Sequence, residues 1–371
     1  MFVSLATIIK SFSRSERVVF WAALASLLLS IAALLWLGIY KNTILTPAPG
    51  GEYTEGIVGQ PTSINPILAS TEADRALVNL LFADLITLTE RYTTSSLGRV
   101  WVVTLKEDLE WSDGKPITSS DVLFTITAIQ NSDSGSPQTA NWQGVTVERI
   151  SEREVKFSLK SPYAYFLDNL KDLRIAPSHI FETIPVANLR LSNYNFEPVS
   201  SGPYTYSSFE KEKNGFISRY VLTANEAYAG SPALIKNFIL KFFSTYNDAI
   251  FDFNHKGIDA LGGLDTASVS DLKINHQLYQ LPLPRYYAIF LNQSNHPALK
   301  DPVIRRALAV ATDAEGIIEQ VVAGYGAPAY GPLVPGIEGY TEALYSTEHF
   351  SLAEAAALIE KNKWLIGEGG I

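Results

Sequence analysis

The stretch WSDGKPITSSDVLFTI, residues 111–126, combines the chemistry of a tight turn with that of a helix start. Asp113 can accept a hydrogen bond from the nearby backbone, and Gly114 can adopt a positive φ, so this pair is typical of a turn. Thr118 can cap a helix, and Asp121, three residues later, completes a capping-box pattern. The stretch therefore predicts a turn that leads into a helix, and we interpret its role as structural.

On both sides of this stretch, strand-like and helix-like segments are mixed throughout the chain. Apolar residues at every second position, or in a short continuous run, predict strands, whereas a spacing of three and four predicts helices. The predicted strands are 54–58, 100–105, 145–150, 154–159, 204–209, 217–223, 238–243 and 286–291. The predicted helices are 72–85, 118–129, 247–255, 302–311, 317–322 and 352–361. This mixture indicates an α/β protein.

Several of these segments carry more specific signals. YYAIFL, residues 286–291, is a continuous apolar run of the kind found in strands that are buried on both faces. Gly257 is expected to end the helix 247–255. The predicted helix starts include Asp301 followed by Pro302, and Thr312 and Ser351, each with a glutamate three residues later. Apolar residues that share one helix face, and are expected to be buried, are Leu77, Leu80, Leu81 and Leu85 in one helix and Ile304, Leu308 and Ala311 in another.

The composition limits the class of protein. The 371 residues suffice for two or three domains. With 47% hydrophobic and 18% charged residues, the chain can form a sizeable core and is not disordered as a whole. The formal net charge of −9, without clustered basic residues, argues against a nucleic-acid partner. The absence of cysteine excludes disulfides, thiolate metal sites, cysteine nucleophiles and a lipidated-cysteine anchor.

The N-terminal region contains a run of 23 residues without a charge, Val18–Tyr40. At about 1.5 Å per residue, this run is about 35 Å long as a helix, enough to cross a hydrocarbon core of about 30 Å. Lys10, Arg14 and Arg17 precede it, and this distribution of positive charge predicts a cytoplasmic N-terminus. The alternative is a cleaved signal peptide, which would have a shorter apolar run followed by an A-x-A-like site.

We therefore expect three N-terminal parts. Residues 1–17 would be cytoplasmic, 18–40 would form an uncleaved single-pass anchor in the cell membrane, and 41–51, which contain TPAPGG, would be a linker. The bulk of the chain would then lie outside the cytoplasm, in the periplasm or at the cell surface.

Seven stretches, in order, resemble conserved motifs of the family 5 solute-binding proteins, the oligopeptide-, dipeptide- and nickel-binding receptors of ABC transporters. They are PTSINPILAS (61–70) with LLFADL (80–85), WSDGKPITSSDVLFTI (111–126), SSGPY (200–204), ANEAYAGSPALIKNFILKFF (224–243), GIDA (257–260), IFLNQSNHPALKDPVIRRALAVATDAEGII (289–318) and SLAEAAALIEKNKW (351–364). The resemblance covers residues 52–371. It departs from the family pattern at Ser200, where the family has glycine, and family members continue well past the last stretch.

The resemblance implies an α/β, two-lobed periplasmic-binding-protein-like fold with an inserted subdomain, preceded by one transmembrane helix. Lobe I would span 52–284, with the inserted subdomain at about 86–197. Lobe II would begin at 285, after the boundary at Pro282 and Pro284, and would be incomplete at residue 371. A solute would bind between the lobes, hinge closure would bury it, and the closed form would dock on the permease of an ABC importer.

Six residues are candidates for ligand binding by this resemblance. Ser70, Thr71 and Glu72 would present main-chain groups to a peptide that lies alongside like an added strand, although the same residues are also suited to a plain helix start. The others are Trp142, which can form a pocket wall or pack in a core, Tyr287, and Asn292, which can bind a ligand or cap a turn.

Other functions and ligands are weighed against this hypothesis. The five histidines form no H-E-x-x-H motif, and no G-x-S-x-G, P-loop or G-x-G-x-x-G motif occurs, so we expect no enzyme activity, metal site or cofactor. Peptides are the expected ligands, with nickel chelates, sugars and other small solutes as alternatives. A membrane-tethered sensor with the same lobes is a further alternative, but 17 N-terminal residues are too few for a cytoplasmic signalling domain.

Overall fold

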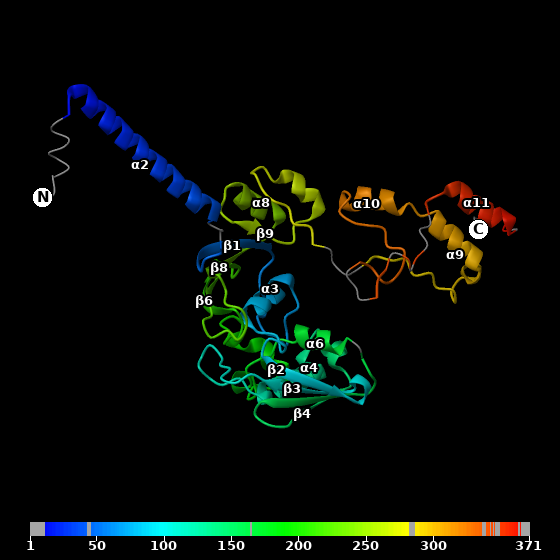
Figure 1. The fold of residues 1–371 in the computed structure, drawn as a ribbon. Helices are drawn as coiled ribbons and strands as arrows, with labels where there is room; N and C mark the ends of the chain where they lie inside the picture. The colour runs from blue at the N-terminus through cyan, green and yellow to red at the C-terminus, as the bar shows by residue number, and fades with distance from the viewer. Residues whose placement is uncertain are drawn as a thin grey trace. The chain divides into compact units, whose positions relative to one another are not determined.

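The computed structural model describes residues 12–42, 46–163, 165–281, 286–335, 339–341, 343, 345, 349–362 and 364 (Figure 1). The chain divides into two compact units, Met1–Gly50 and Gly51–Ile371. In the first unit, helix α2 spans Arg14–Asn42, four residues earlier at its start than the sequence predicts. It is the one helix among the described residues that is long and apolar enough to cross a membrane, and its apolar side chains are exposed.

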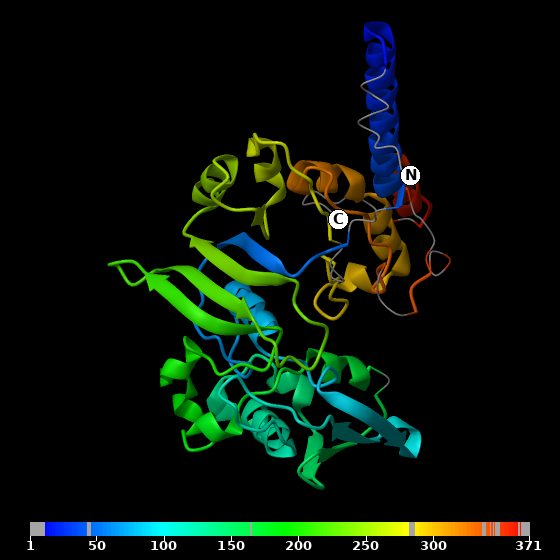
Figure 2. The same ribbon diagram turned by 60° about the vertical axis from the view of Figure 1, so that its left-hand side comes forward.

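The second unit begins with a five-stranded sheet in the order β6-β7-β8-β1-β9. Its strands are β1 (Gly50–Val58), β6 (Tyr204–Lys211), β7 (Ile217–Ala224), β8 (Ile235–Phe243) and β9 (Ala260–Leu261). The pairs β6–β7 and β7–β8 are antiparallel, whereas β1 runs parallel to β9, with Glu55 opposite Ala260. Figure 2 shows β1, in blue, among strands that come much later in the chain.

A second, four-stranded sheet has the order β2-β3-β5-β4 and is antiparallel throughout. Its strands are β2 (Thr89–Ser95), β3 (Val100–Leu105), β4 (Val145–Arg149) and β5 (Glu154–Leu159), and helix α4 packs against β4 and β5. The other α-helices are α3 (Glu72–Leu81), α4 (Ser119–Gln130), α5 (Thr139–Trp142), α6 (Phe166–Asp172), α7 (Ser178–Phe181), α8 (Tyr246–Asn254), α9 (Pro302–Val310), α10 (Ala314–Val322) and α11 (Leu352–Lys361). Short 3₁₀ turns occur at Ser96–Gly98, Ser132–Ser134, Val186–Leu191, Asn193–Asn195, Thr266–Asp271 and Pro297–Lys300.

One hydrophobic core joins the two sheets, and α3 contributes one side of it. Leu77 and Leu81 are fully buried, as predicted from their spacing, and Leu80 is half-buried. The helix ends at Leu81, four residues earlier than predicted. Leu85 is nevertheless fully buried, because the chain after the helix continues through the core.

The end of α3 lies directly against Gly202. The backbone N–H groups of Ser201 and Gly202 donate to the carbonyl of Leu81 at 3.0 and 2.8 Å. A Cβ atom on Gly202 would lie 2.6 Å from the carbonyl carbon of Leu81 and 2.7 Å from the nitrogen of Phe82, closer than real Cβ atoms approach. Glycine is therefore required here by the close approach of two backbones, so Gly202 of the SSGPY stretch has a structural role.

The turn at residues 111–114 is attached to the same place. Gly114 has φ of +78°, as the sequence predicts for this turn, and Trp111 beside it is 2% exposed with its ring against Phe82. Ser112 and Ser200 are joined reciprocally. The N–H of Ser112 donates to the Ser200 carbonyl at 2.8 Å, and the N–H of Ser200 donates to the Ser112 hydroxyl at 2.9 Å. The turn thus connects the small sheet to the large one.

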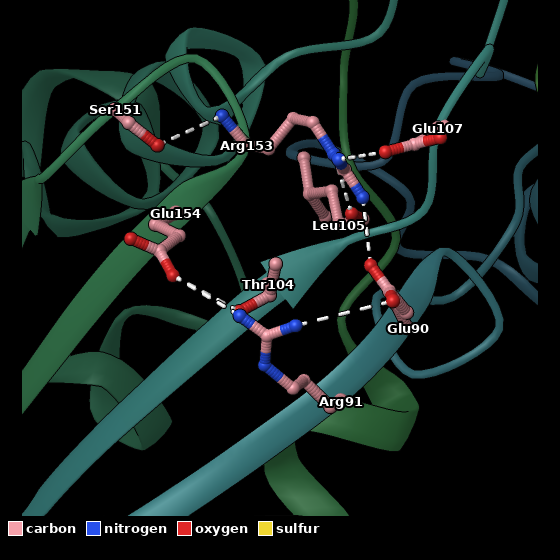
Figure 3. Close-up of polar contacts among 8 residues, drawn as sticks. All are labelled: Glu90, Arg91, Thr104, Leu105, Glu107, Ser151, Arg153 and Glu154. Carbon is pink, nitrogen blue, oxygen red and sulfur yellow. Dashed lines mark hydrogen bonds and ion pairs between the residues drawn. The ribbon is translucent and has the colours of Figure 1, made fainter.

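The charged side chains at one end of the small sheet form a network of ion pairs (Figure 3). Arg153 donates to Glu107 at 2.6 Å, to Glu90 at 2.7 Å and to the carbonyl of Leu105 at 3.0 Å, so it links β2, β3 and the turn before β5. Arg91 lies 3.7 Å from Glu154. These side chains are partly exposed, and each such pair contributes only about 0–1 kcal/mol, so the network orients strand ends more than it stabilises the fold.

The segment 286–291 departs most from the sequence predictions, whereas the three helices predicted after it are present as α9, α10 and α11. The run YYAIFL forms no strand. Tyr287, Ile289 and Phe290 are 93%, 82% and 86% exposed, and no strand among the described residues pairs with them. A strand needs a partner for its backbone groups, so apolar character alone does not form one. The predicted boundary at Pro282 and Pro284 lies outside the described residues.

Smaller corrections concern helix ends and faces. Asp313, and not Thr312, caps α10, because the Asp313 carboxylate accepts from the N–H of Gly316. Lys256, at φ +60°, takes the left-handed position expected of Gly257. The buried residues of α9 are Ile304, Ala307 and Val310, whereas Leu308 is 43% exposed, because α11 packs on the face that carries Ala307 and Val310.

The capping box of α4 is confirmed, and its aspartate does more than cap the helix. Asp121 is 2% exposed. Its carboxylate accepts from the N–H of Thr118 at 2.8 Å, and also from the N–H and hydroxyl of Ser178 at 2.8 and 2.7 Å. One buried carboxylate therefore ties the start of α4 to the start of α7.

We predict that Asp121→Asn lowers the free energy of unfolding by about 2–3 kcal/mol. The carboxylate accepts three hydrogen bonds through two oxygens, whereas a side-chain amide has only one acceptor oxygen. Chemical denaturation followed by tryptophan fluorescence measures the change. Asp133→Asn, at an exposed position in the next turn, should leave the midpoint unchanged. Equal midpoints for the two variants would contradict this role of Asp121.

Candidate ligand-binding site

The segment that precedes α3 is organised by one buried carboxylate, Asp74, which is fully buried. It accepts from the N–H groups of Thr62 at 2.6 Å and Ser63 at 2.9 Å, and from the Thr62 hydroxyl at 2.8 Å. It also accepts from the N–H groups of Thr71 at 3.1 Å and Ser70 at 3.3 Å. These donors supply the hydrogen bonds that a buried charge requires, and they hold both ends of the loop 62–71 together.

The hydrogen bonds decide the charge state of Asp74. Burial alone would raise the pKa of this carboxyl, but the backbone N–H groups of Ser63, Thr62 and Thr71 and the Thr62 hydroxyl together lower it below the ordinary value. Asp74 is therefore ionised at neutral pH.

Ser70 and Thr71 lie where the sequence predicts, at the start of a helix, but their main-chain groups are already engaged. The Thr71 hydroxyl caps α3 by accepting from the N–H of Asp74 at 3.0 Å. The N–H groups of both residues donate to Asp74, and the Ser70 carbonyl accepts from the Arg75 guanidinium at 2.6 Å. Their N–H groups therefore cannot also bind a peptide without releasing Asp74, so the alternative of a plain helix start describes these two residues better than strand-like recognition.

Glu72 is exposed and lies next to a pair of glycines that follow β9. A Cβ atom on Gly263, which has φ of +64°, would lie 3.0 Å from Oε1 of Glu72. The hydroxyl of Tyr246, at the start of α8, donates to the carbonyl of Gly263 at 2.8 Å. Burial, and then the charges of Glu72 and Asp265, raise the pKa of Tyr246. The carboxylates of Glu72 and Asp265 are thus close enough to Tyr246 to disfavour the ionised form of its hydroxyl.

Glu55 approaches the other glycine of the pair. It lies on β1, and a Cβ atom on Gly262 would lie 2.9 Å from its Oε1. Burial raises the pKa of the Glu55 carboxyl. β9 is the last strand of the sheet, so the backbone beyond it faces no further strand among the described residues. Glu55 and Glu72 therefore place two acidic groups beside glycines at a sheet edge.

The other three candidates from the sequence, Trp142, Tyr287 and Asn292, do not contribute to the group of residues beside β9. Trp142 is 2% exposed and packs against Phe157 and Phe166, so it is a core residue and offers no surface to a ligand. Asn292 accepts from the N–H of Ser294 at 3.0 Å, which is the turn-capping alternative. Tyr287 is exposed, and a ligand role for Tyr287 or Asn292 stays a prediction.

Asp74, Glu55 and Tyr246 were not identified from the sequence. The pattern Thr71-x-x-Asp74 is a capping-box signal that could have singled out Asp74. No local signal could have found Glu55 or Tyr246, because both depend on the pairing of β1 with β9, two hundred residues apart. Among the described residues, no group of three or more histidine, aspartate or glutamate side chains is arranged to hold a metal ion.

Comparison with known proteins identifies the family. The family model for bacterial extracellular solute-binding proteins, family 5 (middle region), matches residues 87–371. The chain belongs to this family. The family consists of solute-binding proteins and not of enzymes, in agreement with the prediction from the sequence that the protein is not an enzyme.

The relatives of this family 5 protein include the oligopeptide-binding protein AppA of Bacillus subtilis. AppA is 29% identical over 314 residues, which cover 80% of this chain and 56% of AppA. The AppA structure in complex with a nonapeptide matches with a TM-score of 0.67 and 24% identity over 87% of this chain and 66% of that one. The chain thus spans less than two thirds of the length of AppA.

Two further solved structures share the fold. The ABC transporter substrate-binding protein CtaP of Listeria monocytogenes matches with a TM-score of 0.70 and 25% identity over 86% of this chain and 66% of CtaP. NikZ of Campylobacter jejuni, in complex with Ni(L-His), matches with a TM-score of 0.63 and 24% identity over 88% of this chain and 65% of NikZ. The expected fold class, the two-lobed α/β fold of periplasmic binding proteins, is confirmed.

We predict that Asp74→Asn lowers the free energy of unfolding at pH 7 by about 3 kcal/mol, because the amide loses charge-assisted hydrogen bonds. The folded-state pKa of Asp74 lies below that of the unfolded chain. The contribution of the Asp74 charge to the free energy of unfolding is therefore fully present above about pH 3.9, and it is lost as the pH falls through the folded-state pKa. Denaturation midpoints of both proteins, measured from neutral to acid pH, should converge at the acid end.

Asp172→Asn, at an exposed position in α6, is the matched control and should follow the native protein at every pH. If the difference in denaturation midpoint between the native protein and Asp74→Asn stayed constant with pH, the charge of Asp74 would have no part in holding the loop 62–71.

Proposed function

We propose that the protein is an extracytoplasmic receptor that binds peptides between two lobes and delivers them to an ABC importer. The observation that carries this proposal is the family match over residues 87–371. It is supported by the fold shared with AppA, whose structure was solved with a nonapeptide. NikZ, solved with Ni(L-His), makes a nickel chelate the specific alternative ligand.

The division into lobes is part of the proposal. The small sheet and its helices occupy one continuous stretch from β2 to the 3₁₀ turn at Asn193–Asn195, between two parts of the chain that form the large sheet. This order supports a lobe I of residues 52–284 with a subdomain inserted at about 86–197. Lobe II would begin at 285, and the ligand would be enclosed by closure of one lobe on the other.

Within lobe I, we place the ligand beside β9, Gly262 and Gly263. An edge strand has free backbone groups to which an extended peptide can add, and glycines allow a close approach. Glu55 and Glu72 supply negative charge at this edge, which favours a positively charged ligand group such as the amino terminus of a peptide. Asp74 then acts indirectly, because it fixes the start of α3 from which Glu72 extends.

The test is a thermal-shift screen of the full-length protein in detergent against peptide pools, nickel–histidine chelates and sugars. A ligand at about 100 times its Kd should stabilise the fold by about 2.7 kcal/mol. We expect stabilisation by peptides. A shift with the nickel chelate alone would replace peptides as the substrate class.

The same assay tests the position of the site. Glu72→Gln should weaken the binding of peptides with a free amino terminus by about tenfold, because it removes one of the charges at the sheet edge. N-acetylated peptides should bind the native and variant proteins alike. Glu182→Gln, at an exposed position beyond α7, is the matched control. Unchanged affinity in Glu72→Gln would move the ligand away from β9.

Helix α2 is proposed as an uncleaved, single-pass anchor with the N-terminus in the cytoplasm. Its length, its exposed apolar surface and the preceding positive charges support this topology. After extraction of membranes with alkaline carbonate, we expect the protein in the pellet with residues 12–42 still attached, as detected by mass spectrometry. A variant without residues 1–45 should be released. A native protein that begins after residue 40 would show cleavage instead.

A further inference from the structure

A cavity of about 220 Å³ that is open to solvent lies in the small-sheet region, bounded by α5, the adjoining ends of β4 and β5, and α6. Apolar side chains of Val145, Leu159 and Phe166 contribute to its lining. The polar side chains around them include Asn141, Gln143, Lys160 and Asn169. Apolar surface combined with a few polar groups is the usual composition of a small-molecule site.

The walls of the cavity are held in place by residues that do not line it. The side-chain amide of Gln130 donates to the carbonyls of Trp142 at 2.8 Å and Val145 at 2.7 Å, and so fixes the loop that forms one wall. Phe166 is 1% exposed, and its ring lies 5.9 Å from that of Trp142 and 5.7 Å from that of Phe157. A site with walls fixed in this way loses little entropy when a ligand binds.

The charge of the lining contrasts with that of the chain. The chain has a net charge of −9, yet the described residues that line the cavity include no carboxylate and one cation, Lys160. A Cβ atom on Gly144 would lie 3.5 Å from Cδ of Lys160, so the lysine stem lies over the glycine. Gly144 has φ of +82°, which disfavours any other residue there. The lining therefore offers an ammonium group and neutral amides to an anion.

We propose that this cavity is a second ligand site, which binds a small organic carboxylate. The carboxylate would pair with Lys160, its apolar part would contact the half-buried Val145 and Leu159, and the amides of Asn141 and Asn169 would donate hydrogen bonds. A volume of about 220 Å³ is of the size that suits a single small acid. None of the lining residues belongs to β1, α3 or β9, so this site is independent of the proposed peptide site.

Benzoate and its neutral analogue benzamide are suitable probes, because they have the same shape and differ in charge. Binding to the full-length protein in detergent is followed by isothermal titration and by ligand-observed NMR. We expect saturable binding of benzoate, with benzamide weaker by about tenfold or more. Lys160→Met, which keeps the length of the side chain but removes its charge, should weaken benzoate binding by about tenfold and leave benzamide unchanged.

Two further variants separate a specific site from nonspecific binding. Lys213→Met removes an exposed lysine from the β6–β7 turn and should leave both probes unaffected. Ser161→Trp places a large side chain on the lining and should abolish binding of both probes, with an unchanged circular dichroism spectrum as the check on folding. Equal affinity for the two probes, no effect of Lys160→Met, or displacement of benzoate by peptides that bind the receptor would overturn the proposal.

Discussion

The buried carboxylate of Asp74 is the constraint on which the arrangement of the proposed peptide site depends. A charge in the protein interior is tolerated only where donors surround it, and the loop 62–71 supplies them. This requirement determines where α3 begins. Because α3 has a definite start and length, its last carbonyl, that of Leu81, reaches Gly202 and Ser201, and through Ser200 the turn that contains Trp111. The candidate site and the contact between the two sheets therefore share one helix.

Three of the stretches that resemble family motifs are far apart in the chain but share a structural role. The stretches PTSINPILAS, WSDGKPITSSDVLFTI and SSGPY meet around α3, where Thr62 and Ser63 donate to Asp74, Trp111 is buried, and only glycine fits at position 202. The groups that we propose for ligand recognition lie beside these motifs, in Glu55, Glu72 and the glycines after β9. Such a division lets the framework stay constant while the exposed groups vary with the ligand.

Several features of the fold could be predicted because their causes are local. A capping side chain needs a backbone N–H group only two or three residues away, so Thr118 with Asp121, and Ser351, can be recognised from the sequence, and they cap α4 and α11 as expected. The strands 100–105 and 154–159 match β3 and β5. The predictions that were wrong needed distant partners. YYAIFL has strand character but no partner strand among the described residues, and the buried face of α9 is decided by where α11 packs.

The sequence alone determined the apolar N-terminal helix, the α/β character and the family, because hydrophobic runs, caps and ordered motifs are properties of neighbouring residues. Only the tertiary structure decided which polar groups remain free to bind. Ser70 and Thr71 lie where the motif suggests, yet Asp74 takes their N–H groups. Trp142 is buried in the core, whereas Glu55 lies next to Gly262 because β1 and β9 pair in parallel. Hydrogen-bond satisfaction and burial are settled by contacts across the whole chain, and a linear pattern does not contain them.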